Sequence, residues 1–137
     1  MWKYYAILSA VFAAFTVILA KIGIKGVSGN VATAVRTVVV VMIAWAIVLI
    51  SGQMKEVREL SKNNIIFLTL SGIATGLSWI FYFKALETGD VSKVAPIDKL
   101  SIVITMLLAF VLLRETVEPK VIAGGVLITV GAIIIIW

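Results

Sequence analysis

The sequence contains no cysteine and no histidine, and only 14% of its 137 residues are charged. Without these two residue types the chain has no disulfides, no thiol nucleophile, no imidazole base and none of the usual zinc ligands. These absences exclude most classes of enzyme. The low charge is also unlike a soluble domain, in which about a quarter of the residues are charged.

Apolar residues make up 62% of the sequence, and the mean hydropathy is +1.17. One small core cannot bury this many apolar side chains. A helix needs about 20 apolar residues to cross about 30 Å of hydrocarbon. Segments near that length are 4–20, 31–50, 65–83, 94–113 and 121–137. The sequence therefore predicts an all-α fold, an integral membrane bundle of five transmembrane helices that forms a single domain over residues 1–137.

The connections between these segments are short or polar. Residues 51–64 form the longest polar stretch, which predicts a solvated loop with a helical turn. Pro96 is expected within the first turn or so of the fourth helix, where its missing N–H costs little. Lys3 before an apolar run is also typical of a signal peptide, but no small-x-small cleavage site is evident and four more apolar segments follow. We therefore expect the first segment to stay in the bundle.

Lys and Arg outnumber Asp and Glu by twelve to seven, but they are scattered between apolar segments, so no nucleic-acid partner is expected. Five helices place the termini on opposite sides of the membrane, and the Lys and Arg residues divide equally between the two sides. The orientation of a membrane protein follows the side that carries more Lys and Arg, so an equal division leaves two alternatives for this chain. Either Arg36 and Lys99 lie inside helices and do not count, which favours a cytoplasmic N-terminus, or the chain inserts both ways as an antiparallel homodimer. The expected location is the cytoplasmic (inner) membrane, with the lipid bilayer as a partner.

Charged residues inside membrane helices are costly and mark candidate substrate paths. Arg36 lies about five residues into its predicted helix, so we expect it to face the bundle interior or a wet cavity. Asp98 either forms a structural ion pair with Arg36 or Lys84 or is stabilised by the dipole of its own helix. Tryptophans within the helices either line the path or pack against other helices. The candidate path residues are Arg36, Lys84, Asp98, Lys99, Trp45, Trp79 and Tyr82.

Small residues predict where helices approach closely in lipid. Gly72 and Gly76 form a GxxxG pair on the third predicted helix, and Gly125 and Gly131 provide small faces on the fifth. We expect these four glycines to pack helices rather than to bind a ligand.

The segment from Leu77 to Glu115, LSWIFYFKALETGDVSKVAPIDKLSIVITMLLAFVLLRE, carries a specific pattern. An aromatic helix end runs into an Ala-Leu pair, a glycine precedes a short connection, a small residue and a proline open the next helix, and an acidic residue ends it. A last helix patterned with glycine follows. The residues of this pattern are Trp79, Tyr82, Phe83, Ala95, Pro96 and Glu115. With Lys21 closing the first helix and Arg36 early in the second, the whole chain resembles the EamA family of the drug/metabolite transporter superfamily.

This resemblance implies an exporter of a small polar metabolite or drug that works by alternating access, in a ten-helix fold of two inverted five-helix halves. The sequence supplies one half, which implies assembly as a homodimer around a small-molecule substrate. No cofactor and no metal are expected. If export is coupled to protons, the candidate groups are Asp98, Glu87 and Asp90.

An alternative that the sequence leaves open is a non-transporting membrane subunit, or a component of a lipid-linked sugar flippase, that acts with a partner protein. An enzyme is not expected. Residues 87–90 are similar to an intramembrane aspartyl protease motif, but glutamate stands where the first glycine should be, and no second catalytic aspartate lies within a predicted helix.

Overall fold

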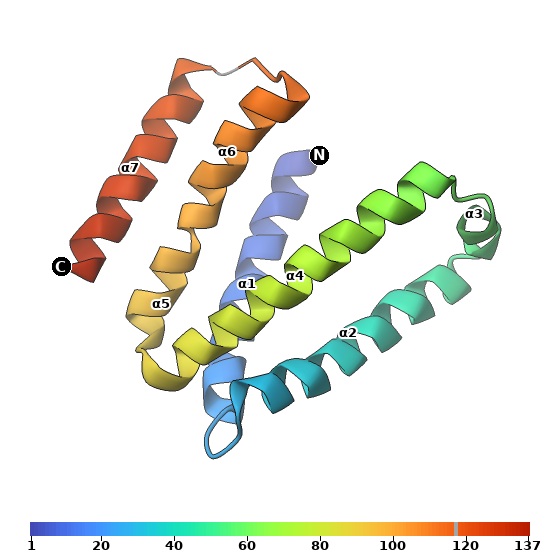
Figure 1. Ribbon diagram of the computed structural model, residues 1–137, viewed down its shortest axis with the longest axis horizontal. Helices are drawn as coiled ribbons and strands as arrows, with labels where there is room; N and C mark the ends of the chain where they lie inside the picture. The colour runs from blue at the N-terminus through green and yellow to red at the C-terminus, as the bar shows by residue number, and fades with distance from the viewer. Residues whose placement is uncertain (117) are drawn as a thin grey trace. The chain divides into compact units, whose positions relative to one another are not determined.

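The computed structural model describes residues 1–116 and 118–137, and this part of the chain is helical with no strand (Figure 1). Five stretches are long and apolar enough to cross a membrane, and α5 and α6 together make one of them. The predicted all-α membrane fold with five spans is thereby confirmed. The helices are α1 (Trp2–Gly23), α2 (Gly29–Ile50), α3 (Met54–Arg58), α4 (Lys62–Thr88), α5 (Val91–Asp98), α6 (Leu100–Leu113) and α7 (Pro119–Ile136).

The ends of the helices follow local signals in the sequence. The side chain of Ser28 accepts a hydrogen bond from the backbone N–H of Val31 and so caps the start of α2. Gly26 and Gly52 have positive φ angles of 77° and 69° in the turns after α1 and α2, where a side chain would be strained. The helical turn expected in the polar loop is present as α3.

The chain divides into two compact units, which we describe separately. The α2–α4 unit comprises Ile18–Thr88, and the α5–α7 unit comprises Met1–Val17 with Gly89–Trp137.

In the α2–α4 unit, α2 and α4 run antiparallel and lie side by side, and the start of α2 approaches the end of α4 (Figure 1). Phe83 and Leu86 of α4 are 2% and 0% exposed, and Thr33 of α2 is 8% exposed. The sequence predicted that the third span ends at Phe83, but α4 continues to Thr88. Lys84 and Glu87 therefore lie on a helix and not in a connection.

In the α5–α7 unit, one membrane span is broken into two helices, α5 and α6, at Lys99. The sequence predicted Pro96 within the first turn or so of this span, where its missing N–H costs little, and the structure places it further into the helix. Asp90 is the N-cap residue of α5 and the helix begins at Val91, so Pro96 falls in the second turn. There a proline lacks the N–H that would bond to the carbonyl of Ser92 and crowds the preceding turn, and α5 ends two residues later, at Asp98.

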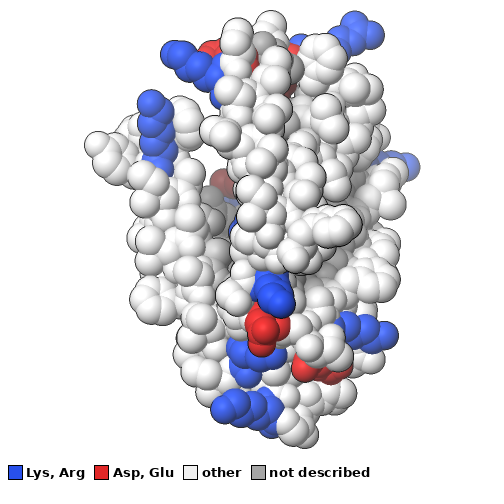
Figure 2. Space-filling view, turned by 90° about the vertical axis from the view of Figure 1, so that its left-hand side faces the viewer, with Lys and Arg blue, Asp and Glu red and all other residues white. Residues whose placement is uncertain are grey.

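On the face shown in Figure 2, most of the surface is uncharged, and the charged side chains occur in small groups. Large apolar side chains on all the long helices are exposed, for example Phe12, Trp45 and Leu127. Exposed apolar surface of this extent is stable in a lipid bilayer and not in water. The protein is accordingly a multi-pass membrane protein.

Candidate functional site

The most polar contact region of the α2–α4 unit lies where the start of α2 meets the end of α4. We call it the α2–α4 seam. Residues three or four apart share one face of a helix, so each helix contributes one stripe of side chains. The seam consists of Gly29, Thr33 and Arg36 from α2 and of Trp79, Phe83, Leu86 and Glu87 from α4.

Within the seam, Arg36 packs against two aromatic rings of α4. Its Cζ lies 4.5 Å from the ring centroid of Trp79 and 5.5 Å from that of Phe83. Both distances are within the range of about 6 Å over which a guanidinium is attracted to a ring face. The seam therefore joins two of the predicted path residues, Arg36 and Trp79, and adds Phe83 to them.

The hydrogen-bond donors of Arg36 have no protein partner in this unit. No hydrogen bond or ion pair is found between Arg36 and another residue of Ile18–Thr88, all of which the structure describes, and the side chain of Tyr82 lies close enough to interact electrostatically with Arg36. The Arg36 nitrogens also keep some accessible surface, because no fully buried side-chain nitrogen or oxygen in the described chain lacks a partner. A guanidinium carries five N–H donors, so water or an oxyanion that reaches the seam can bind them.

Two contacts join the helix ends at the edge of the seam. The Nζ of Lys21 donates a hydrogen bond to the carbonyl oxygen of Leu86 at 2.5 Å, and the backbone N–H of Gly29 donates one to Oε1 of Glu87. Backbone groups at helix ends lack partners within their own helix, and these contacts satisfy one at each end. A carboxylate at the start of α2 and an ammonium at the end of α4 also match the two helix dipoles.

Gly29 lets α2 come close enough to form these contacts. A Cβ at this position would lie 2.8 Å from Oε1 of Glu87 and 3.1 Å from the backbone carbonyl carbon of Phe83. The Glu87 side chain would have to turn away, and the backbone of α4 at Phe83 would have to shift by a few tenths of an ångström. Sequence reasoning did not single out Gly29, because a glycine within Ser-Gly-Asn has the appearance of a turn residue.

Asp98 and Lys99 lie in the α5–α7 unit, at the break between α5 and α6. The Nζ of Lys99 is 3.4 Å from Oδ2 of Asp98. Lys99 is exposed and Asp98 is partly exposed, so this ion pair contributes little to stability. The predicted pairing of Asp98 with Arg36 or Lys84 would join different units and stays a prediction. The break itself is a distinctive feature, because interrupted membrane helices commonly form the ion and substrate sites of transporters.

The remaining predicted residues occupy more ordinary positions. Lys84 is exposed on α4, Trp45 is exposed on α2, and Tyr82 is half-buried with its ring edge-on to Phe83. A Cβ on Gly72, Gly76 or Gly131 would meet nothing within 4 Å. Gly125, in contrast, is buried beneath the Sδ of Met106, which lies 3.3 Å from the position of such a Cβ. These four glycines were expected to pack helices. Gly125 contacts a neighbouring helix within the α5–α7 unit, and the packing role of all four stays a prediction.

The α6 and α7 helices enclose an open apolar groove of about 600 Å³, which includes Met106, Phe110 and Gly125. Its walls offer almost nothing to a polar solute, so the groove does not resemble a site for a polar metabolite. Among residues 1–116 and 118–137, no group of three acidic side chains is placed to hold a metal ion.

Comparison with known proteins relates this helical membrane chain to transporters. A family model described as the EamA-like transporter family matches residues 1–137. A protein from a Sinorhizobium species, described as an uncharacterized transporter in the cobO 3' region, is 41% identical over 134 residues, which cover 98% of this chain and 95% of that protein. No solved structure matches the chain. The chain therefore belongs to the EamA-like transporter family.

Proposed function

We propose that this membrane transporter exports a small polar metabolite or drug across the cytoplasmic membrane by alternating access. The observation that carries the proposal is Arg36, a cation within a membrane span that packs on Trp79 and Phe83 and has unused hydrogen-bond donors. A charge in this position is costly in lipid, and such residues usually contact a substrate or a wet cavity. The broken span at Asp98 and Lys99 provides a second polar feature within the membrane.

The working unit in this proposal is a homodimer. The Sinorhizobium relative named as a transporter is matched over 95% of its length, so it too is close to the size of a single five-helix unit. Within their own units, Gly72, Gly76 and Gly131 have no described atom close to where a Cβ would lie, and small faces of this kind favour close approach by another helix. A five-helix chain that inserts in both orientations would form the inverted pair of halves that many transporters contain.

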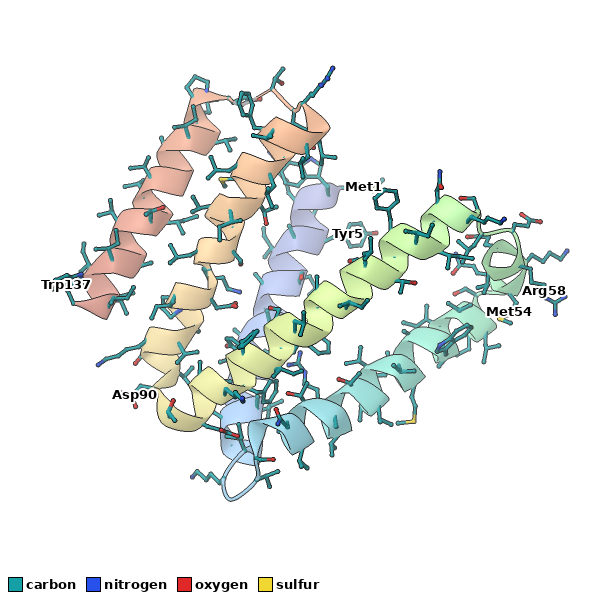
Figure 3. All side chains as sticks on the ribbon, in the orientation of Figure 1. Met1, Tyr5, Met54, Arg58, Asp90 and Trp137 are labelled. Carbon is teal, nitrogen blue, oxygen red and sulfur yellow. The ribbon has the colours of Figure 1, made fainter. Side chains whose placement is uncertain are left out.

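The transport proposal can be tested before the substrate is identified. The purified protein is reconstituted into liposomes loaded with a defined mixture of amino acids, organic acids, sugar phosphates and nucleosides, and the loss of each solute is followed by mass spectrometry. We expect the protein to accelerate the efflux of one chemical group of solutes, and we expect Arg36→Ala to abolish this efflux. The matched control is Arg58→Ala, because Arg58 is exposed on α3 outside the membrane spans and points away from α2 and α4 (Figure 3).

Two results would contradict the transport proposal. Efflux no faster than from empty liposomes would argue against a self-sufficient carrier. Normal efflux by a correctly inserted Arg36→Ala variant would remove Arg36 from the path.

The orientation of the chain tests the homodimer. Single cysteines in the 55–62 loop and next to Lys93 are labelled from each side of the membrane, and the background is clean because the native chain has no cysteine. Labelling of both positions from both sides would support an antiparallel homodimer. Labelling of each position from one side only would exclude that arrangement and direct the search to a parallel dimer or a partner subunit.

Proton coupling, if present, is assigned in this proposal to Asp98. Asp98→Asn should then make efflux independent of a pH gradient, with Glu56→Gln on exposed α3 as the control. Unchanged coupling in Asp98→Asn would rule out that role.

A further inference from the structure

We propose that the transported solute is an anion, and that its carboxylate or phosphate group binds the guanidinium of Arg36 in the α2–α4 seam. This proposal rests on the transport function proposed above and assigns a chemical class to its substrate. Three features of the seam support it. Arg36 stacks on two rings, its N–H donors have no protein acceptor, and the nearby carboxylate of Glu87 already accepts the backbone N–H of Gly29.

The aromatic rings hold the guanidinium without neutralising it. Trp79 and Phe83 lie one helical turn apart on α4, and Cζ of Arg36 is within 5.5 Å of both ring centroids. Ring faces attract a cation, but they accept no hydrogen bond at the edges of its plane. The rings restrict the long Arg side chain before a ligand arrives, which lowers the entropy cost of binding.

The protein supplies no anion to Arg36. Ile18–Thr88 contains three carboxylates, of which Glu56 and Glu59 lie in or beside the polar helix α3. The third, Glu87, accepts the backbone N–H of Gly29 and is not within ion-pair distance of Arg36. An unpaired cation within a membrane span gives the seam a positive potential, which attracts anions and repels cations.

An oxyanion satisfies this site better than water does. Water can accept the guanidinium hydrogen bonds, but it leaves the positive charge uncompensated in a medium of low dielectric constant. A carboxylate or phosphate matches the fork of guanidinium donors with two parallel hydrogen bonds and also neutralises the charge. Because a solute and an anionic lipid headgroup offer the same chemistry, the test must separate these two sources.

The chain offers an internally controlled test, because Arg36, Arg58 and Arg114 are its only arginines. Purified protein in nanodiscs of neutral phosphatidylcholine is treated with phenylglyoxal, which modifies accessible guanidinium groups, and peptide mass spectrometry measures the rate at each arginine. The probes are inorganic phosphate and acetate, added at constant ionic strength. We expect phosphate to slow the modification of Arg36 in a saturable way, by about tenfold at a concentration tenfold above its Kd, since protection follows 1 + [L]/Kd. The rates at exposed Arg58 and Arg114 should not change.

Two tryptophan variants separate the role of the ring from a general effect on folding. Trp79→Phe keeps an aromatic face for Arg36 and should keep the phosphate protection. Trp79→Leu removes that face, so it should raise the phosphate concentration needed for protection while the variant still elutes as a single species. Equal protection in Trp79→Leu and the native protein would overturn the positioning role of the ring.

The remaining outcomes decide the proposal. Three results would overturn the proposal. If Arg36 reacts with phenylglyoxal only after denaturation, solutes cannot reach it. If phosphate protects all three arginines equally, the effect is charge screening, and if neither phosphate nor acetate changes the Arg36 rate, no anion binds there. A lipid headgroup is the ligand if phosphatidylglycerol in the nanodiscs protects Arg36 without phosphate, and phosphate gives no protection in neutral nanodiscs. That result would overturn the proposal that the site binds a solute. If Arg36 is not protected but the liposomes still show efflux, the anion proposal fails and the transport function stands. If Arg36 is protected but no solute leaves the liposomes, the anion site stands and the transport function fails.

Discussion

Replacement of Gly29 by alanine tests the close approach of α2 and α4. The added Cβ would lie 2.8 Å from Oε1 of Glu87 and 3.1 Å and 3.2 Å from the backbone carbonyl carbon and Cβ of Phe83. The Glu87 carboxylate can swing aside because it ends a flexible side chain, but the Phe83 backbone belongs to α4 and cannot move alone. Overpacking of this kind costs about 1–3 kcal/mol. We expect Gly29→Ala to lower the free energy of unfolding by an amount in that range.

Unfolding in mixed dodecyl maltoside and dodecyl sulfate micelles, followed by circular dichroism, measures this change. Gly23→Ala is the matched control, because Gly23 lies in the same unit and a Cβ there would meet nothing within 4 Å. The double variant Gly29→Ala/Glu87→Ala separates the two clashes, and most of the cost should persist in it because the Phe83 backbone remains in place. The reasoning is refuted if Gly29→Ala unfolds like Gly23→Ala, or if removal of the Glu87 side chain abolishes the whole effect.

Three further predictions concern other contacts of the same fold. Glu87→Gln keeps an acceptor for the Gly29 N–H but removes the charge at the start of α2, so the free energy of unfolding should fall by about 0.3–1 kcal/mol, whereas Glu56→Gln on exposed α3 should have no measurable effect. Trp79→Leu removes one ring from Arg36 and should cost more stability than Trp79→Phe; equal losses in the two variants would argue against the cation–π contact. Pro96→Ala restores a helical N–H, so the amides of residues 98–100 should exchange with deuterium more slowly than in the native protein, and unchanged exchange would mean that the proline does not cause the break.

The membrane helices could be predicted from the sequence because each is a long apolar segment with polar residues at both ends. The lengths of α4 and α5 could not, since a charged residue marks the end of an apolar run but not the end of a helix. Lys84 does not end α4, because a long side chain near a helix end reaches water while its backbone stays helical. Asp90 occupies the N-cap position of α5 and the helix begins at Val91, so Pro96 falls in the second turn, where a proline is less well tolerated.

The sequence could identify residues of the candidate site but not the contacts between them. Arg36 was identified because a charge within an apolar segment is conspicuous, and Trp79 because tryptophans within spans are few. Their contact could not be derived, since it depends on which faces of α2 and α4 meet. That pairing of faces is fixed at Gly29 and Glu87, which are 58 residues apart, and a single sequence holds no signal that links them.

The position of Arg36 along α2 sets how far an anion must travel to reach it. Arg36 follows Gly29 by seven residues, which is about 10 Å along the helix axis at 1.5 Å per residue. If α2 enters the hydrocarbon near Gly29 and runs along the membrane normal, Arg36 lies about one third of the way across a layer of about 30 Å. In an antiparallel pair of chains the second Arg36 would lie at the same depth below the opposite surface, about 10 Å further along the normal. An anion that leaves one guanidinium toward the opposite surface would then pass the second guanidinium before it reaches that surface.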